Sequence, residues 1–233
     1  MRIAITANGP GEVAGWVRPL VRRLYERAPD TEVHLFLVPD DYATGHEAQL
    51  ARRLFPSAHV YDPKAYLQVA LGRTVEGLPA RVDIVQYMGG DLMHAMRVRA
   101  RLQGRATAYK FSNRRYSERW SRVYAVDEKN VEQLRGWNVP ADRIERVGNL
   151  AIDGALLEAQ APLEARAPND GILIMPGSRG YEVENLIPFF FTMAMRMLRE
   201  RPDLPLAFGI SPFTPVAEVA RAIERGGDPR VWA

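Results

Sequence analysis

Cysteine is absent from the 233-residue sequence, which excludes disulfide bridges, thiolate nucleophiles and cysteine-bound metal ions. Only four histidines occur, and no two of them have the His-x-x-x-His spacing that sets two imidazoles on one face of a helix. Asp40 and Asp41 are adjacent and do not form an Asp-x-Asp pair. We therefore expect no metal site and no bound cofactor.

Long hydrophobic runs are also missing. The longest apolar candidate, residues 186–198, is interrupted by Pro188 and Arg196 and is shorter than the roughly 18 residues that cross a bilayer. The opening apolar run is followed by polar Asn8 and Glu12, so we do not expect a signal peptide. We expect a cytoplasmic protein.

Three common sequence motifs of enzymes are absent. There is no Walker motif, so a P-loop nucleotide site is excluded. Pro176 stands two residues before Ser178, where a nucleophile elbow needs glycine, which disfavours hydrolase chemistry. The third glycine of the opening segment, Gly15, falls one position too late for Gly-x-Gly-x-x-Gly, which disfavours a dinucleotide cofactor.

Charge is concentrated in one region although the net charge is only +3. Residues 92–122 contain nine basic side chains against Glu118 alone: Arg97, Arg99, Arg101, Arg105, Lys110, Arg114, Arg115, Arg119 and Arg122. The alternatives are an ordinary solvated surface and a patch for an anionic partner. Since no nucleic-acid motif accompanies the patch, we expect an anionic membrane surface or phosphosugar and no nucleic acid.

Short apolar runs alternate with amphipathic stretches of helix length, which predicts βαβ units and a parallel sheet of Rossmann type. Residues 9–15 are expected to be a loop between the first strand and the helix over 16–27. We expect a first Rossmann-like domain over residues 1–155, a linker over 156–170 and a second domain over 171–233. The second has about 65 residues against the usual ~100–150, so we expect it to be incomplete.

The most informative segment is residues 171–184. An apolar run ends at Pro176-Gly177, Ser178 and Arg179 follow, and a helix is expected from residue 181. The free N–H groups of a helix start bind phosphate, and an arginine fork matches phosphate oxygens. The alternative is an ordinary strand–helix turn with a solvated arginine.

This segment also resembles the Pro-Gly-Ser-Arg-x-x-Glu-Val-Glu signature of lipid-A-disaccharide synthase. That family also has a Gly-Asn/His-Pro-x-x-Asp stretch, matched here by residues 148–153 with Leu150 in place of proline. Its opening Gly-Glu-x-Ser-Gly-Asp loop is matched by residues 11–16, where Ala14 and Trp16 replace Ser and Asp. The resemblance follows the order of nearly the whole chain.

The resemblance implies a GT-B-like glycosyltransferase that moves an acylated glucosamine-type sugar from UDP to a glycolipid with inversion. The first domain would bind the acceptor and the second the UDP-sugar, which is a substrate and not a cofactor. No metal is expected, and the enzyme would be peripheral at the inner face of the cytoplasmic membrane.

The same resemblance implies roles for individual residues. Asp91, after Gly89-Gly90, would be the general base, and the segment that follows in the family, Ala-Pro-Asp-Phe-Asn, is here Leu92-Met93-His94. The other implied site residues are Gly11, Glu12 and Gly15 in an acceptor-side loop, Gly177, Ser178 and Arg179 at the donor phosphate, and Asn149.

Three alternatives stay open. Asp91 is also suited to cap a helix that starts at residue 92. A UDP-sugar 2-epimerase has the same two-domain architecture and would need no lipid acceptor. A chain with an incomplete donor domain would be an inactive fragment that binds lipid.

Overall fold

The computed structural model describes residues 1–39, 47–111, 113–158, 171–177, 180–211 and 214–226. The chain divides into two compact units, Met1–Glu158 and Ala159–Ala233, which we describe separately. Ser178, Arg179 and Asp40 lie outside the described residues. No helix in the described ranges is long and apolar enough to cross a membrane.

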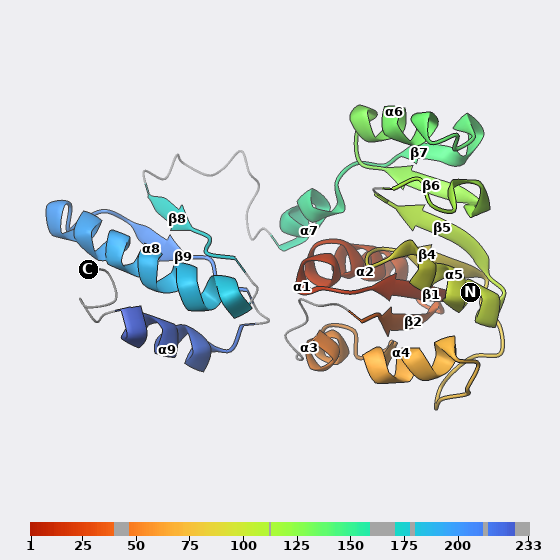
Figure 1. Ribbon diagram of the computed structural model, residues 1–233, viewed down its shortest axis with the longest axis horizontal. Helices are drawn as coiled ribbons and strands as arrows, with labels where there is room; N and C mark the ends of the chain where they lie inside the picture. Colours follow the sequence, from red (N-terminus) through yellow and green to blue (C-terminus); the bar gives the residue numbers. More distant parts are fainter. Residues whose placement is uncertain (40–46, 112, 159–170, 178–179, 212–213, 227–233) are drawn as a thin grey trace. The chain divides into compact units, whose positions relative to one another are not determined.

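The first unit is built on a seven-stranded parallel sheet in the order β3-β2-β1-β4-β5-β6-β7. In Figure 1 these strands follow one another from β7 at the top to β2 near the bottom. The strands are β1 (Arg2–Ala7), β2 (Glu32–Leu37), β3 (His59–Tyr61), β4 (Ile84–Tyr87), β5 (Arg105–Tyr109), β6 (Arg122–Ala125) and β7 (Ile144–Arg146). This order is that of a Rossmann-type sheet, which confirms the expected fold class.

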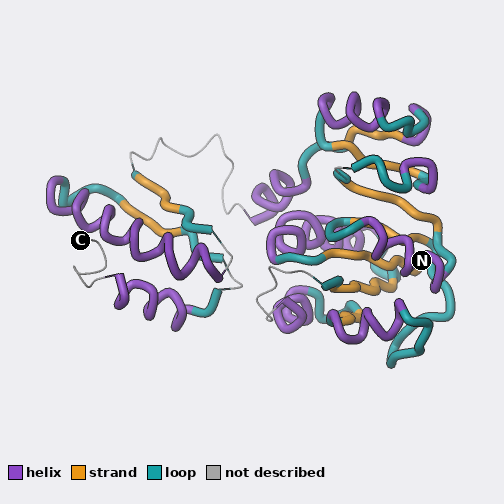
Figure 2. Tube along the Cα trace, viewed as in Figure 1, coloured by secondary structure: helices purple, strands orange, loops and turns teal. Residues whose placement is uncertain are grey.

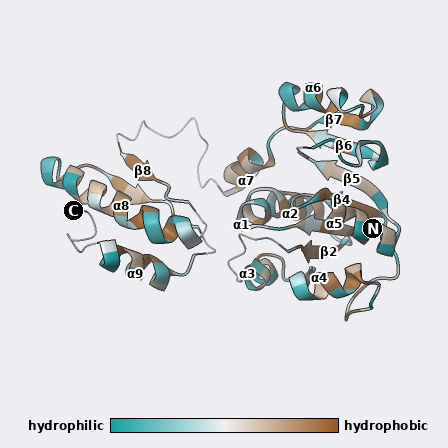
Figure 3. Ribbon diagram, in the orientation of Figure 1, coloured by the Kyte–Doolittle hydropathy of each residue, from teal (hydrophilic) through white to brown (hydrophobic). Residues whose placement is uncertain are grey.

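The sheet is covered by helices, as expected for parallel strands that are buried on both faces. The first unit contains α1 (Pro10–Glu12), η1 (Val13–Val17), α2 (Arg18–Arg27), α3 (Glu47–Leu54), α4 (Pro63–Ala70), α5 (Leu92–Leu102), η2 (Ser117–Arg119), α6 (Glu128–Gly136), η3 (Ala141–Arg143) and α7 (Leu150–Glu158). Figure 2 shows the helices flanking the strands. In β1 and β2 every residue after the first is buried, and β2 is coloured as hydrophobic in Figure 3.

Aspartates start three of these helices. The side chains of Asp62, Asp91 and Asp127 accept hydrogen bonds from backbone N–H groups in the first turns of α4, α5 and α6. Each bond satisfies a donor that the helix itself leaves unpaired, which typically contributes about 1 kcal/mol. These helices therefore begin shortly after a strand ends. Because the strands are parallel, the side chains that follow them lie together at the carboxyl end of the sheet.

The expected loop over residues 9–15 is wrong. A helix begins at Pro10, whose ring suits the first helical position, and continues through the π-helical η1 into α2. The backbone N–H of Val13 bonds to the Gly9 carbonyl at 3.2 Å, which closes the first turn. The glycines in this stretch suggested a loop, whereas burial of Val13 and Val17 favours the helix.

Helix α7 was not expected, because its sequence lacks a clear amphipathic pattern. Its N-terminus is capped by Asn149, whose Oδ1 accepts from the Ala151 N–H at 3.1 Å. The helix packs against η1, where a Cβ at Gly15 would lie 3.8 Å from the Ala151 Cβ. Gly15 therefore lies at a helix–helix contact and not in a loop.

The second unit has two parallel strands, β8 (Ile172–Ile174) and β9 (Leu206–Phe208), and two helices, α8 (Gly180–Glu200) and α9 (Val216–Gly226). Val183 and Ile187 of α8 pack with Ala222 of α9 in a small core. The strand–turn–helix predicted around residues 171–184 is present, with β8 and α8 on either side of the turn.

Candidate functional site

The sheet order reverses direction between β1 and β4. On one side of this point the strands run β2 and β3, and on the other β5, β6 and β7. Ligands of open parallel α/β sheets bind in the crevice outside the carboxyl ends of the strands at such a switch point. The segments that leave β1 and β4 here contain Asn8, Glu12 and Asp91.

Two glycines let these segments approach closely. A Cβ at Gly89 would lie 2.7 Å from Asn8 Oδ1 and 2.7 Å from Glu12 Cγ, so both side chains lie against this glycine. Gly90 has φ +84°, which L side chains rarely adopt, and its Cβ would lie 2.6 Å from a Val38 methyl group. The close approach of these segments therefore depends on glycine at both positions.

Substitution of Gly90 by alanine should destabilise the fold more than the same change at Gly72. Both have nearly equal positive φ, and a Cβ at Gly72 meets nothing within 4 Å. Gly72→Ala should cost roughly 1–2 kcal/mol for the backbone conformation alone. Gly90→Ala should cost about 1–3 kcal/mol more, because the new methyl overlaps Val38. Urea unfolding measures both, and equal losses would contradict the close approach.

Asp91 is exposed, and both of its carboxylate oxygens have partners. Oδ1 accepts the Met93 N–H at 2.7 Å as the N-cap of α5, and Oδ2 pairs with Arg115 Nη1 at 3.0 Å. It follows the carboxyl end of β4, and whether it serves as the general base stays a prediction. Asp91 also caps α5, as the alternative prediction stated. Because the cap occupies Oδ1, a role as general base requires a free lone pair on Oδ2, beside Arg115.

Asn8 is an additional polar group at this point that the sequence analysis did not single out. Its Oδ1 is buried and has no hydrogen-bond partner among the described residues. A buried acceptor without a donor is costly, typically about 1–3 kcal/mol. A ligand hydroxyl or N–H is the kind of group that would satisfy it.

Tyr87 fixes the Gly90 turn. Its hydroxyl donates to the Gly90 carbonyl at 2.7 Å. Burial raises the pKa of Tyr87, and the carboxylates of Glu12 and Asp91 raise it further. The phenol therefore keeps its proton and remains a donor.

His94 and Tyr66 form a second pair beside Asp91 that the sequence did not indicate. His94 lies in the first turn of α5, and its Nδ1 is 2.5 Å from the Tyr66 hydroxyl. Burial lowers the pKa of His94, while the Asp91 carboxylate partly opposes this and Arg97 adds to it. The imidazole is therefore neutral near pH 7.

A pH dependence of stability follows from this lowered pKa. The unfolded chain, with a histidine pKa near 6.5, takes up the proton before the folded chain does. The contribution of His94 to stability is present above pH 6.5 and is lost as the pH falls below it. We expect His94→Gln to reduce the fall in urea midpoint between pH 7.5 and 5.5. An unchanged fall would contradict a buried neutral imidazole.

The other predicted site residues of the first unit lie in two different places. Glu12 lies against Gly89 at the switch point, and Gly11 stands in the first helical turn with open space around its Cβ position. Gly15 and Asn149 lie instead at the η1–α7 contact. Nearby, Tyr109 stacks edge-on against Trp16 and accepts the Leu150 N–H at 2.9 Å.

The basic run over residues 92–122 does not form one patch. Arg105 and Arg122 begin β5 and β6, so they lie at the amino end of the sheet, where Arg122 pairs with Glu145. Arg115 lies at the opposite, carboxyl end beside Asp91. The exposed cations that follow β5 are Lys110, Arg114, Arg115 and Arg119. Lys110 lies over the Trp16 ring, and Arg115 and Arg119 over Tyr116.

In the second unit, Gly177 has φ +101°, and a Cβ there would overlap the Glu182 carboxylate. Glu182, in the first turn of α8, therefore lies against Gly177. The two residues that would contact a phosphate most directly, Ser178 and Arg179, lie outside the described residues.

Comparison with solved structures identifies similar folds. The UDP-GlcNAc 2-epimerase of Neisseria meningitidis bound to UDP-GlcNAc has a TM-score of 0.58 and 13% identity, over 97% of this chain and 69% of that chain. S. aureus MnaA with UDP has a TM-score of 0.59 and 18% identity, over 98% of this chain and 68% of that chain. The UDP-GlcNAc 2-epimerase of Methanocaldococcus jannaschii has a TM-score of 0.55 and 12% identity, over 97% of this chain and 68% of that chain.

This chain shares their fold. The comparison confirms the expected α/β class of GT-B-like type with a Rossmann-type parallel sheet. No protein-family model matches the sequence, and no curated protein matches it. The resemblance to lipid-A-disaccharide synthase stays a prediction.

Proposed function

We propose that this protein is a UDP-sugar-dependent hexosyltransferase resembling lipid-A-disaccharide synthase, which transfers an acylated glucosamine-type sugar to a glycolipid with inversion. The observation that carries the proposal is the position of three polar residues at the switch point of the sheet: Asn8 and Glu12 lie against Gly89, and Asp91 follows two residues later. An unsatisfied acceptor beside two carboxylates suits a polyhydroxylated substrate. The similar structures with UDP or UDP-GlcNAc support a UDP-sugar as donor.

The proposed step is an in-line displacement. Asp91 takes the proton from an acceptor hydroxyl, whose oxygen then bonds to the anomeric carbon of the donor sugar. The bond from that carbon to the phosphate oxygen breaks, and UDP leaves with the electron pair. Arg179, Ser178, Gly177 and the first N–H groups of α8 stabilise the negative charge. Arg115 has to share Asp91 Oδ2 with the acceptor hydroxyl.

In this proposal, cations in the segment after β5 contact the membrane that holds the glycolipid acceptor. Lys110 and Arg114 are exposed in the segment that follows the carboxyl end of β5, and they suit an anionic membrane surface. This supports a peripheral enzyme at the inner face of the cytoplasmic membrane with a glycolipid acceptor, and we propose no metal for the transfer.

One observation favours a second candidate. The similar structures include proteins named UDP-GlcNAc 2-epimerase, so an epimerase that acts on a soluble sugar nucleotide is the alternative. Such an enzyme needs no second substrate to accept the sugar.

Incubation of the protein with UDP-N-acetylglucosamine, with and without a glucosamine-based glycolipid in vesicles, separates the candidates. A transferase releases UDP only when the glycolipid is present and adds the sugar to it. Turnover of the nucleotide sugar alone would identify the epimerase. Sedimentation with anionic vesicles without turnover would contradict both and support a lipid-binding protein without catalysis.

A further inference from the structure

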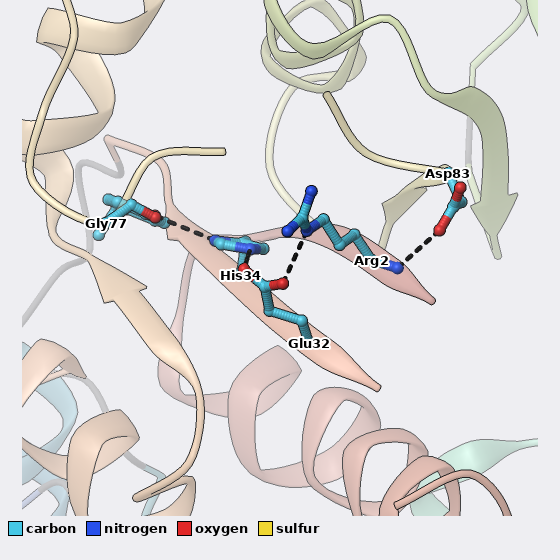
Figure 4. Close-up of polar contacts among 6 residues, drawn as sticks. Arg2, Glu32, His34, Gly77 and Asp83 are labelled. Atoms are coloured by element: carbon cyan, nitrogen blue, oxygen red, sulfur yellow. Dashed lines mark hydrogen bonds and ion pairs between the residues drawn. The ribbon is translucent and has the colours of Figure 1, made fainter. Parts of the chain in front are cut away.

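Two histidines that are 25 positions apart lie side by side at the amino end of the first unit's sheet. His34 of β2 and His59 of β3 are register partners, and their rings stack with centroids 4.8 Å apart and an angle of 9° between planes. Glu32 precedes His34 by two residues, which puts both side chains on the same face of β2. Figure 4 shows Glu32 between His34 and Arg2. This end is opposite to the one that carries Asp91.

The hydrogen bonds around His34 define its tautomer. The Tyr61 hydroxyl is 2.6 Å from the Gly77 carbonyl and 3.0 Å from His34 Nδ1. A phenol has one proton and a carbonyl has none, so Tyr61 donates to Gly77. His34 Nδ1 must then carry a proton and donate to the Tyr61 oxygen. In a neutral imidazole this leaves a lone pair on Nε2.

That lone pair faces another acceptor. His34 Nε2 is 2.9 Å from Glu32 Oε1, and the His34 side chain is fully buried. Two acceptors at this distance repel each other unless a cation lies between them. The cation is either a second proton on the ring or a metal ion.

We propose that Glu32, His34 and His59 bind a divalent transition metal ion such as Zn²⁺. Their ligand atoms all lie within 4.8 Å of one another, and two imidazoles with one carboxylate form a familiar ligand set for such ions. Ring nitrogens coordinate in the ring plane, so the exposed His59 has to turn out of its stack. The site would tie the short edge strand β3 to β2.

The neighbours of the three ligands support the assignment. Arg2 Nε holds Glu32 Oε2 at 2.7 Å and leaves Oε1 directed at His34. The Tyr61 oxygen accepts a hydrogen bond from the Nδ1–H of His34, as outer partners of metal-bound histidines usually do. His59 also lines a surface hollow together with Tyr61 and Gly77, which gives an ion a path to the site.

Calorimetric titration of chelator-treated protein with ZnCl₂ tests the site. We expect one Zn²⁺ per chain, and His59→Ala should weaken its binding at least ~100-fold, since loss of an outer partner alone costs about 10–100-fold. Because His59 is exposed, the variant should keep the fold, which circular dichroism checks. Glu26→Gln is the matched control, since Glu26 is also a carboxylate paired with arginines. Absent binding, or equal binding by His59→Ala, would overturn the proposal.

Nitrogen-15 NMR of the imidazoles gives a second readout. With Zn²⁺ we expect His34 to show a protonated Nδ1 and a metal-bound Nε2. A His34 ring that carries protons on both nitrogens with and without Zn²⁺ would overturn the metal site in favour of a buried ion pair with Glu32.

Discussion

Replacement of Asp91 by asparagine should lower the rate of sugar transfer by about 10²–10⁴-fold, the usual contribution of a general base. Asparagine caps helices about as well as aspartate, so the bond to the Met93 N–H should persist and the stability should change little. The change therefore removes the basic oxygen and keeps the cap. Steady-state kinetics with UDP release, together with urea unfolding, measure both effects.

Two further variants complete this test. Asp91→Ala removes the cap as well, and it should cost about 1 kcal/mol of stability in addition to the lost rate. Arg115→Gln leaves the carboxylate and the cap in place, and loss of an exposed ion pair should cost ~0–1 kcal/mol. Full turnover by Asp91→Asn would mean that Asp91 only caps α5.

Replacement of Arg179 by alanine should weaken UDP binding by about 100-fold. A charge-assisted hydrogen bond contributes roughly 1.5–3 kcal/mol, and the proposed diphosphate contact would lose at least one. Isothermal titration of the wild-type and variant proteins with UDP measures the change directly. Arg179→Lys should recover part of the affinity, because it keeps the charge and loses the fork.

Arg199→Ala is the matched control for charge. Arg199 is an exposed arginine in the last turn of the same helix that follows the phosphate corner. Its removal lowers the net charge equally and leaves the helix start intact, so the affinity for UDP should stay unchanged. Equal losses in both variants would indicate general electrostatic attraction and no specific phosphate site.

The sheet was predictable because its strands are nearly continuous apolar runs between turn residues. The runs around residues 3–7 and 106–111 correspond to β1 and β5 with small differences at their ends. The turn and helix after β8 were also predictable, since Pro176-Gly177 ends the strand and the apolar spacing of α8 begins soon after. Local sequence patterns carry this information because each element buries one face or both.

The contacts between elements were not predictable from these patterns. Glycines over residues 9–15 suggested a loop, but Gly15 allows η1 to pack against α7, a partner that is more than 130 residues away. His34 and His59 have no meaningful spacing along the chain, and only the register of β2 and β3 pairs them. Alignment of the two neighbouring strands in their correct register, which pairs residue 34 with residue 59, is the signal that would have identified them.

The position of the basic run in the fold was not predictable either. Its nine cations are close in sequence, but a parallel strand carries the chain from one edge of the sheet to the other. Arg105 at the start of β5 and Lys110 just after its end therefore lie at opposite ends of the strand, roughly 16 Å apart at about 3.3 Å per residue. Arg115, in the segment after β5, pairs with Asp91.

Hydrogen–deuterium exchange with and without UDP tests the central claim most directly, because it reports where the nucleotide binds. We predict slower exchange in peptides that cover residues 175–183, at the turn and first helical turn after β8, and unchanged exchange around His34 and His59. Protection confined to the β1–β4 switch point, or no protection anywhere at saturating UDP, would contradict a donor site at this corner and with it the proposed transferase.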